Sequence, residues 1–356
     1  MPGAICRTAK CTNRQPARAR VISIAVPVRC GASGDERYNN RDANGGDTII
    51  GLKGARPMIR IANAPCSWGI LEFDGDAQPA SYATVLDEMR ETGYSGTELG
   101  DWGFMPTDPA ELGRELASRQ LALLGAFVPV ALADASTHAA GATTAVRTAT
   151  LMRDAGAADA FIVLSDANGS VPARERHAGR ITPDLGLADA QWATFASGAE
   201  RVAREVRDRA GLRTVFHPHC GGYVETPAEI AQLMRRTDPS LLGLVLDTGH
   251  VVYGGGDPLR VFDEHGNRVW HVHFKDCDRA VADAARRDGI GYLQAVRSQL
   301  FCELGAGTVD FAAVSHALGR AGYDGWIVVE QDVFPGYGSP KQSARKSRDY
   351  LRRLGL

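Results

Sequence analysis

The chain alternates short apolar runs with amphipathic segments from residue 59 to its C-terminus, and this alternation restricts the fold more than any other feature. The apolar runs have the length of strands that are buried on both faces of a parallel sheet. They cover residues 59–64, 96–100, 121–128, 160–165, 213–219, 242–247, 269–275 and 326–331. Segments between them, such as residues 82–93 and 192–211, carry apolar residues at the spacing of a helix. We therefore predict an α/β fold, a (β/α)8 TIM barrel, with an open doubly wound sheet as the alternative.

The first 57 residues differ from the rest of the chain. Residues 1–20 contain no acidic residue, and residues 31–48 are polar and rich in Gly, Asn and Asp without any periodicity. Such segments cannot bury enough apolar surface to fold. We predict a disordered N-terminal extension over residues 1–57 and a barrel over residues 58–356, with Met58 directly before the first strand.

The composition argues against several classes of function. The formal net charge is −2, which argues against a nucleic-acid partner. No apolar run approaches the roughly 18 to 20 residues of a membrane-spanning helix, so we expect no membrane partner. The seven cysteines are odd in number and contain no C-x-x-C pair, which predicts a reducing, cytoplasmic location without disulfides.

Polar side chains gather at the ends of the predicted strands, where a TIM barrel carries its catalytic residues. Residues two apart on a strand share a face, so the members of each set point the same way. Buried charges are costly unless they are paired or bind something, and a divalent metal resolves that cost. Imidazole and carboxylate ligands without thiolate suit Mn²⁺, Co²⁺, Zn²⁺ or Mg²⁺. The residues are Glu98, His217, His219, Asp247, His250, His271, His273, Lys275, Glu330 and Asp332.

Four motifs in this region resemble a known family. Asp247-Thr-Gly-His250, His273-Phe-Lys275-Asp276, residues 304–310 and Glu330 are similar to the xylose-isomerase-like barrels of sugar phosphate isomerases and epimerases. Residues 64–69, residues 96–100 and the H-x-H at 217–219 most resemble the inosose dehydratases. Those enzymes remove water from 2-keto-myo-inositol with Mn²⁺ or Co²⁺. The resemblance covers the chain from Met58 onward.

The resemblance implies a metal set of His217, Asp247, His273 and Glu330. The first position departs from the superfamily, which has glutamate there. In the epimerases that glutamate and the last one act from opposite sides of the substrate carbon, so His217 argues against symmetrical epimerisation. His250 and Arg279 match positions that contact substrate oxygens.

These residues suggest a hypothesis: metal-assisted elimination of water from a ketone, in which a base takes the α-proton and an acid protonates the departing hydroxide. Lys275 would neutralise the enolate or pair with a nearby aspartate, and Trp68 would lie under a sugar ring or pack in the core. The sequence does not rank the acid-base candidates, which are Glu330, His219, His250 and Glu98.

Other functions remain open at this point. A sugar isomerase or epimerase, such as a ketose 3-epimerase or hydroxypyruvate isomerase, would use the same metal and return the proton. A zinc endonuclease for abasic DNA shares the superfamily, and a sugar-binding barrel without catalysis is a further alternative. We expect a small sugar or cyclitol substrate and, by analogy with related barrels, a homo-oligomer.

Two connections after strands are unusually long, residues 166–187 and residues 277–307. Long loops on this side of a barrel cover the active site, so both are candidate lids or ordinary solvated loops. Gly305 and Gly307 in the second loop suggest a weak phosphate-binding signal.

Overall fold

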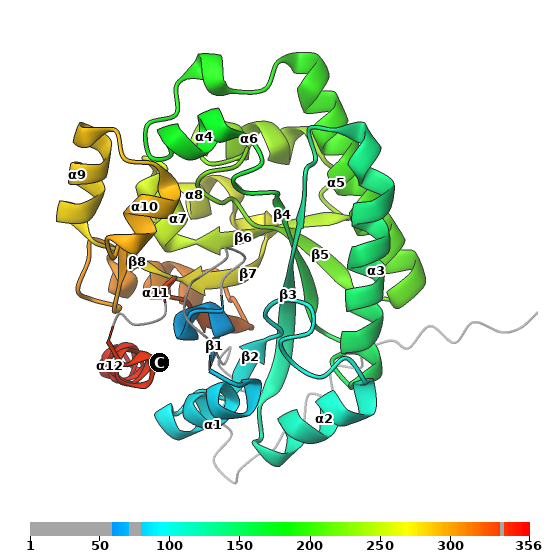
Figure 1. The fold of residues 1–356 in the computed structure, drawn as a ribbon, viewed down its shortest axis with the longest axis vertical. Helices are drawn as coiled ribbons and strands as arrows, with labels where there is room; N and C mark the ends of the chain where they lie inside the picture. Colours follow the sequence, from blue (N-terminus) through cyan, green and yellow to red (C-terminus); the bar gives the residue numbers. More distant parts are fainter. Residues whose placement is uncertain (1–58, 71–79, 335–337) are drawn as a thin grey trace, which may run out of the picture. The chain divides into compact units, whose positions relative to one another are not determined.

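A closed barrel of eight parallel strands forms the centre of the fold (Figure 1). The computed structural model describes residues 59–70, 80–334 and 338–356. Around the barrel the strands follow the order β1, β10, β7, β6, β5, β4, β3, β2. Their bounds are β1 Arg60–Asn63, β2 Gly96–Glu98, β3 Ala122–Val130, β4 Phe161–Asp166, β5 Arg213–Phe216, β6 Leu242–Asp247, β7 Val269–Phe274 and β10 Trp326–Val329. All eight predicted strands are present, and the closed barrel replaces the open-sheet alternative.

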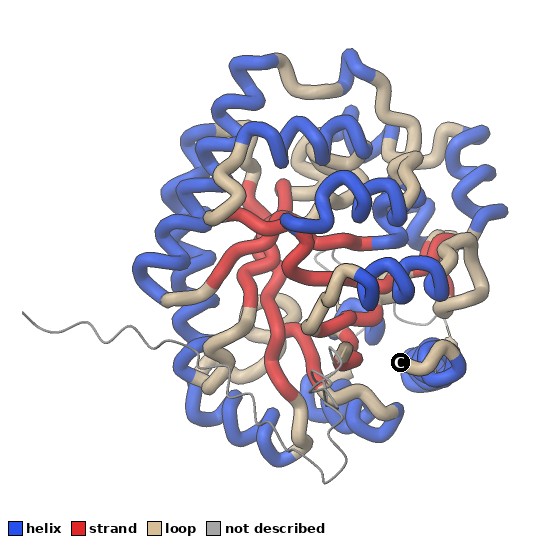
Figure 2. The backbone as a smooth tube through the Cα atoms, turned by 180° about the vertical axis from the view of Figure 1, so that it is seen from behind, coloured by secondary structure: helices blue, strands red, loops and turns tan. Residues whose placement is uncertain are grey.

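Helices surround the strands and bury their apolar faces against them (Figure 2). They are α1 Tyr82–Thr92, α2 Pro109–Ser118, α3 His138–Asp154, α4 Pro172–His177, α5 Asp189–Ala210, α6 Pro227–Arg236, α7 Thr248–Tyr253, α8 Pro258–His265, α9 Arg279–Asp288, α10 Tyr292–Arg297, α11 Phe311–Arg320 and α12 Pro340–Arg353. Within the described ranges, none of these helices has the length and apolar character needed to cross a bilayer. The predicted disordered extension, residues 1–57, lies outside the described residues.

The alternation of side chains along each strand separates the outer core from the barrel interior. On β6, Leu244 and Leu246 join the large core beneath the helices. Val245, between them, packs inside the barrel with side chains from β4 and β5. Because the period is two, Asp247 points to the same interior, at the carboxyl end of the strand. The barrel thus carries its polar strand-end residues inward.

Strand β5 is shorter than predicted because of a proline. The prediction extended it to His219, but the strand ends at Phe216. The backbone N–H of His217 still donates to Leu164 on β4, at 2.7 Å. Pro218 has no N–H, so pairing cannot continue past it. His217 therefore lies at a strand end and His219 in the following loop.

The two long connections contain structure of their own and pack against each other. The first carries α4, and the second carries α9, α10 and a two-stranded antiparallel sheet of β8 (Asp276–Cys277) and β9 (Phe301–Cys302). Arg180 donates to the carbonyls of Ala285 and Ile290, at 2.9 and 3.0 Å. The backbone N–H of Leu293 donates to Glu175, at 3.1 Å. The two connections, residues 166–187 and 277–307, thus pack into one layer, which we call the roof.

A buried ion pair fixes the first of these loops to the barrel wall. The Arg174 guanidinium binds both carboxylate oxygens of Glu229 on α6, at 2.8 and 3.0 Å, and Arg174 is only 1% exposed. Its Nε also donates to the Gly222 carbonyl, at 2.9 Å. A bidentate pair of this kind has the geometry that compensates for desolvation.

Arg174→Met should lower the free energy of unfolding by about 3 to 5 kcal/mol, because it leaves the Glu229 carboxylate buried without its counter-charge. Urea denaturation measures the loss. Arg201→Met is the matched control, since Arg201 is exposed and pairs with Glu205 on the surface of α5, where the expected loss is below about 1 kcal/mol. Equal losses in the two variants would contradict this role for Arg174.

Candidate active site

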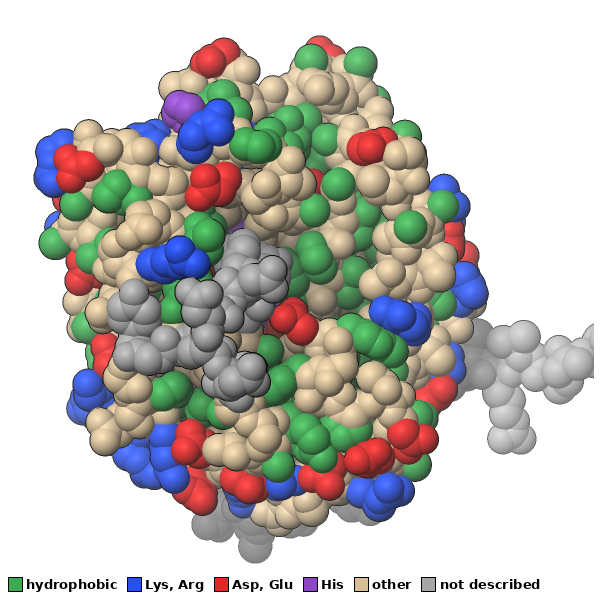
Figure 3. All heavy atoms as spheres, in the orientation of Figure 1, with side chains coloured by type: hydrophobic (Ala, Val, Ile, Leu, Met, Phe, Trp, Pro, Cys, Tyr) green, Lys and Arg blue, Asp and Glu red, His purple; other side chains and the backbone are tan. Residues whose placement is uncertain are grey.

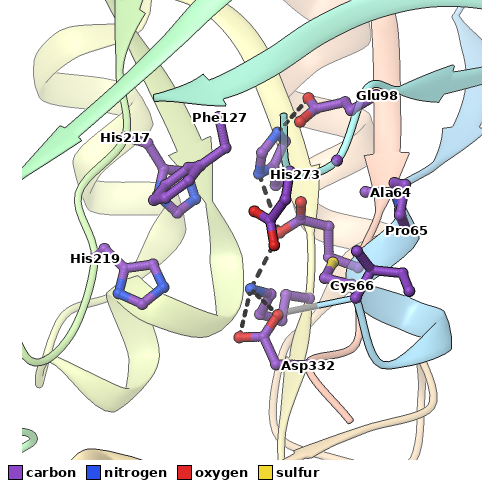
Figure 4. A pocket seen from close by; sticks show the side chains of 14 residues that line it. Ala64, Pro65, Cys66, Glu98, Phe127, His217, His219, His273 and Asp332 are labelled. Atoms are coloured by element: carbon purple, nitrogen blue, oxygen red, sulfur yellow. Dashed lines mark hydrogen bonds and ion pairs between the residues drawn. The ribbon is translucent and has the colours of Figure 1, made fainter. Parts of the chain in front are cut away.

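A pocket opens at the carboxyl ends of the strands, where TIM barrels place their active sites. Polar side chains from β2, β7 and the segments after β5 and β10 face into it, with an apolar wall beside them (Figure 4). His217 and His219 lie on one side, and Glu98, His273, Asp332 and Cys66 lie on the other. The lining residues are Ala64, Pro65, Cys66, Ile70, Glu98, Gly100, Asp101, Phe127, His217, His219, His273, Lys275, Glu330 and Asp332.

One cluster has the composition of a metal site. His217, Asp247, His273 and Glu330 are buried, and each offers a ligand atom within 4.8 Å of the others. Nε2 of His217 lies 3.3 Å from Oδ2 of Asp247, and Nδ1 of His273 lies 3.2 Å from Oε2 of Glu330. These are the four residues that the sequence predicted as ligands, and the structure brings all four together.

Glu98 orients one of these histidines. Its Oε1 accepts hydrogen bonds from Nε2 of both His271 and His273, at 2.8 and 3.0 Å. Because Nε2 of His273 donates, Nδ1 is the nitrogen left to face Asp247 and Glu330, and it has no hydrogen-bond partner. A histidine whose second nitrogen is fixed by a carboxylate is the usual arrangement around a protein-bound metal. The donor set therefore fits a divalent ion.

Electrostatics explain why Glu98 stays ionised. Burial alone would raise the pKa of Glu98, but His273 and the hydrogen bonds from both histidines outweigh it and lower the pKa to about 2. Burial likewise opposes charge on His273, yet Glu330 and Glu98 hold the pKa of His273 well above its usual value. The carboxylates that stabilise the extra proton on His273 would also attract a metal cation.

Lys275 lies beside this cluster as a buried ammonium. Its Nζ is 3.0 Å from Oε2 of Glu330 and 3.0 Å from each carboxylate oxygen of Asp332. Burial would lower the pKa of Lys275, but Asp332, Glu330 and Asp247 outweigh it and raise that pKa well above its usual value. The expected pairing of Lys275 with Asp247 is a longer contact, 3.8 Å.

His219 and His250 stack on each other, with ring centroids 3.9 Å apart. Burial lowers the pKa of both well below the usual value; His217 adds to the shift of the His219 pKa, and His219 adds to that of His250. Nδ1 of His219 lies 2.8 Å from the Cys220 carbonyl and donates to it, which leaves a lone pair on Nε2. The Cys220 N–H lies 3.2 Å from Nδ1 of His250, and Nε2 of the same ring lies 3.1 Å from Nζ of Lys275.

Two predicted substrate contacts do not reach the pocket. Trp68 is buried in the core and donates from its indole nitrogen to Glu88, at 2.7 Å, so it packs rather than binding a ring. Arg279 is exposed at the first position of α9 and lines a separate depression with Asp257 and Asp310. His250 lies directly behind the lining residues and meets Lys275 at 3.1 Å.

The loop with Gly305 and Gly307 binds an internal carboxylate. Asp276 is fully buried and accepts the backbone N–H groups of Gly305, Gly307 and Val309, at 2.8, 2.9 and 3.1 Å. A Cβ at Gly307 would lie 2.4 Å from Asp276, so this approach requires glycine. These N–H groups are not available for a phosphate.

Sequence reasoning missed the partners that complete the site. Asp332 lies two residues after Glu330 and therefore on the same inward face, but no role was predicted for it. Tyr292, from α10, places its hydroxyl 3.2 Å from Asp332 and 3.5 Å from Nε2 of His219. No strand pattern points to Tyr292, because only the packing of the second long loop brings it here.

The comparisons with known proteins agree with the fold. The sequence profile of the xylose isomerase-like TIM barrel family matches residues 86–354. The chain belongs to this family. The inosose dehydratase of Lacticaseibacillus casei is 32% identical over 300 residues, which cover 82% of this chain and 96% of that protein. The inosose dehydratase of Geobacillus kaustophilus is also 32% identical, over 83% of this chain and 94% of its own.

Solved structures share the fold at low sequence identity. A probable 3-DHS dehydratase from Bacillus anthracis aligns with 83% of this chain and 99% of its own, at 15% identity and a TM-score of 0.60. An L-ribulose 3-epimerase aligns with 83% of this chain and 94% of its own, at 18% identity and a TM-score of 0.61. These likenesses support the barrel, and they include both a dehydratase and an epimerase.

Glu225 links the roof to the loop after β5 and predicts a pH dependence of stability. It accepts the N–H groups of Gly179 and Gly221, at 2.6 and 3.0 Å. Burial raises the pKa of Glu225 from 4.5 to about 7, although these hydrogen bonds oppose the shift. Between those values the folded state binds more protons than the unfolded chain, so the free energy of unfolding falls as the pH rises from about 4.5 to about 7.

Glu225→Gln should remove this contribution, which amounts to about 3 kcal/mol at most across that range. Urea denaturation gives the difference in the free energy of unfolding between wild type and variant. This difference should change between pH 5 and pH 7.5. Glu205→Gln, on the exposed side of α5, is the control. An unchanged difference at the two pH values would contradict the raised pKa of Glu225.

Proposed function

We propose that the chain is a divalent-metal-dependent dehydratase of a polyol ketone, with 2-keto-myo-inositol as its substrate. The observation that carries the proposal is a pair of unlike groups beside one metal-type ligand set. His219 offers a lone pair on Nε2, and Lys275 offers ammonium protons, both at the pocket wall. The inosose dehydratases at 32% identity support the same substrate class.

His217, Asp247, His273 and Glu330 would hold the ion, with Mn²⁺ or Co²⁺ expected and Mg²⁺ or Zn²⁺ as alternatives for a mixed nitrogen and oxygen set. When bound, the ion supplies Lewis-acid polarisation of the ketone. Glu98 does not act on substrate in this mechanism, because its Oε1 is occupied by two histidine N–H groups. We assign Glu98 to positioning His273.

The elimination itself needs one base and one acid. Nε2 of His219 takes the α-proton of the ketone as the α-carbon forms a double bond to the β-carbon. The bond from the β-carbon to its hydroxyl oxygen breaks, and Lys275 gives that oxygen a proton, so that water leaves. Asp332 and Glu330 keep Lys275 in place between turnovers. Glu330 is the alternative base, since it also lines the pocket.

This arrangement favours dehydration over epimerisation. An epimerase removes and returns a proton on opposite faces of one carbon, which calls for two groups able to exchange the same proton. The pocket has an imidazole lone pair and an ammonium instead. The occupied N–H groups of the Gly305 loop further favour a substrate without phosphate. Isomerisation or epimerisation of a ketose is the second candidate, supported by the fold shared with epimerases.

The surface charge and the cysteines support the same proposal. Acidic and basic side chains are interspersed on the face seen in Figure 3, which favours a small substrate over a nucleic acid. The cysteines of the described segments, Cys66, Cys220, Cys277 and Cys302, are free thiols, as a reducing cytoplasm would leave them. We keep the barrel domain at residues 58–356 and expect a homo-oligomer.

Proton NMR in D2O tests the reaction. The full chain is loaded with Mn²⁺, freed of unbound metal, and incubated with 2-keto-myo-inositol or with fructose. We expect loss of the inosose signals and formation of a dehydrated dione, with fructose unchanged. Deuterium incorporation into the ketose, or a new epimer of it, with the inosose unchanged would replace dehydration by isomerisation or epimerisation.

Asp247→Asn should reduce metal content and turnover at least 100-fold while the fold persists. The amide can still accept the His250 N–H that caps α7, a bond of 2.8 Å in the native chain, but it lacks the ligand charge. Asp257→Asn makes the same change at the N-cap of α8, outside the pocket lining, and should retain both properties. Metal analysis, circular dichroism and turnover assays measure the outcome. Full activity of Asp247→Asn would remove the metal proposal.

A further inference from the structure

The carboxylates that line the pocket differ in how their charge is compensated. Glu98 accepts two histidine N–H groups. Glu330 and Asp332 each lie 3.0 Å from the Lys275 ammonium. Asp101 also lines the pocket, and within the described part of the chain no hydrogen bond or ion pair reaches its carboxylate. Its acceptor atoms are therefore available to a ligand.

A turn directly after β2 holds the backbone of Asp101. Gly100 has a φ of +72°, and a Cβ at this position would lie 3.1 Å from the Pro65 side chain. Both the left-handed conformation and the close approach favour glycine. The backbone N–H of Phe104 donates to the Asp101 carbonyl, at 3.0 Å. Local contacts on both sides thus fix the place at which Asp101 meets the pocket.

Asp101 lies at the solvent-facing end of the pocket. It is exposed, whereas Glu98, three residues earlier, is only 4% exposed. The surrounding chain still removes water from part of the Asp101 carboxyl group, and this burial raises its pKa. A carboxylate that loses water without gaining a partner is stabilised by hydrogen-bond donors that a ligand brings. The hydroxyl groups of a polyol are donors of this kind.

The rest of the pocket indicates how a ring would lie in it. His219 and Lys275 are buried at the inner end, 7% and 1% exposed. Phe127, on the side of the histidines, and Pro65, opposite, supply apolar walls that can contact the C–H faces of a ring (Figure 4). A ring whose reacting edge lies at the inner end turns its other hydroxyls toward the open end, where Asp101 lies.

We infer that Asp101 determines substrate specificity, because its carboxylate accepts hydrogen bonds from hydroxyls on the ring carbons that do not react. The inference rests on the proposed function, which places the reacting carbons beside His219 and Lys275. A site that binds a substrate hydroxyl discriminates strongly against an analogue that lacks it. The pocket therefore selects a fully hydroxylated ring over a simple hydroxyketone. Asp101 transfers no proton in the elimination and acts only in binding.

Two substrates test this role. 2-Keto-myo-inositol carries a hydroxyl on every other ring carbon, whereas 2,3-dihydroxycyclohexanone has only the α-hydroxyl and the departing β-hydroxyl. Asp101→Ala should lower kcat/KM for the first about 10- to 100-fold relative to the second, as expected for a lost hydrogen bond to a charged group. The loss should appear in KM with kcat nearly unchanged, because the contact is the same before and during the reaction.

Two further variants control this comparison. Asp101→Asn keeps one acceptor oxygen and loses the charge, so its substrate preference should lie between those of the wild type and Asp101→Ala. Asp154→Ala removes an exposed carboxylate at the end of α3, outside the pocket lining, and should keep the preference of the wild type.

Binding of myo-inositol gives a readout without turnover, because this cyclitol has no ketone and cannot eliminate water. Calorimetric titration of the Mn²⁺-loaded full chain should show binding about 10- to 100-fold weaker in Asp101→Ala than in the wild type. Unchanged substrate preference and unchanged cyclitol binding would overturn the role of Asp101 and leave the proposed function in place. Binding that depends on Asp101, without dehydration of 2-keto-myo-inositol, would overturn the reaction and keep this role. A wild type that neither binds nor converts a cyclitol overturns both.

Discussion

The site depends on a group of charges that are almost completely buried. Asp247, Glu330 and Asp332 are each less than 10% exposed and converge on a lysine that is 1% exposed. Isolated carboxylates in such a place would be strongly destabilising, so the group requires compensating positive charge. Lys275 supplies one charge, and the imidazole and carboxylate groups beside it are compatible with a divalent ion. The stability of the barrel mouth and its chemistry therefore come from the same contacts.

The barrel produces this convergence through simple geometry. Parallel strands bring their carboxyl ends to one rim, and the two-residue period points alternate side chains inward. This is why polar residues at this rim could be predicted from sequence: Asp247, His273 and Glu330 each follow or end an apolar run at an inward position. Their choice as metal ligands came from the family resemblance and stays a prediction. His217 was found by the same rule, although Pro218 ends its strand earlier than the prediction placed it.

The residues that the sequence missed, or whose contacts it predicted wrongly, lie in loops and in the core. Arg279 matches a family position that contacts substrate, yet the chain forms β8 first and starts α9 away from the pocket. Tyr292 and Arg174 act through tertiary packing: Tyr292 contacts Asp332 and His219, and Arg174 holds the first long connection to α6. No local period encodes such contacts, because they depend on how two long loops pack against each other. Trp68 looked like a ring-binding residue, but burial is the more common use of tryptophan beside a strand.

The histidine at position 217 and the lysine at position 275 both limit the negative charge that is buried at the barrel mouth. A glutamate at 217, as the wider superfamily has, would add a further carboxylate beside Asp247, Glu330, Asp332 and Glu98. Every additional buried negative charge needs additional compensation. Histidine at 217 avoids that charge, and Lys275 keeps its proton next to the pocket. The change that removes a second carboxylate base from the epimerase arrangement thus also permits an acid in its place, which is what the elimination of water requires.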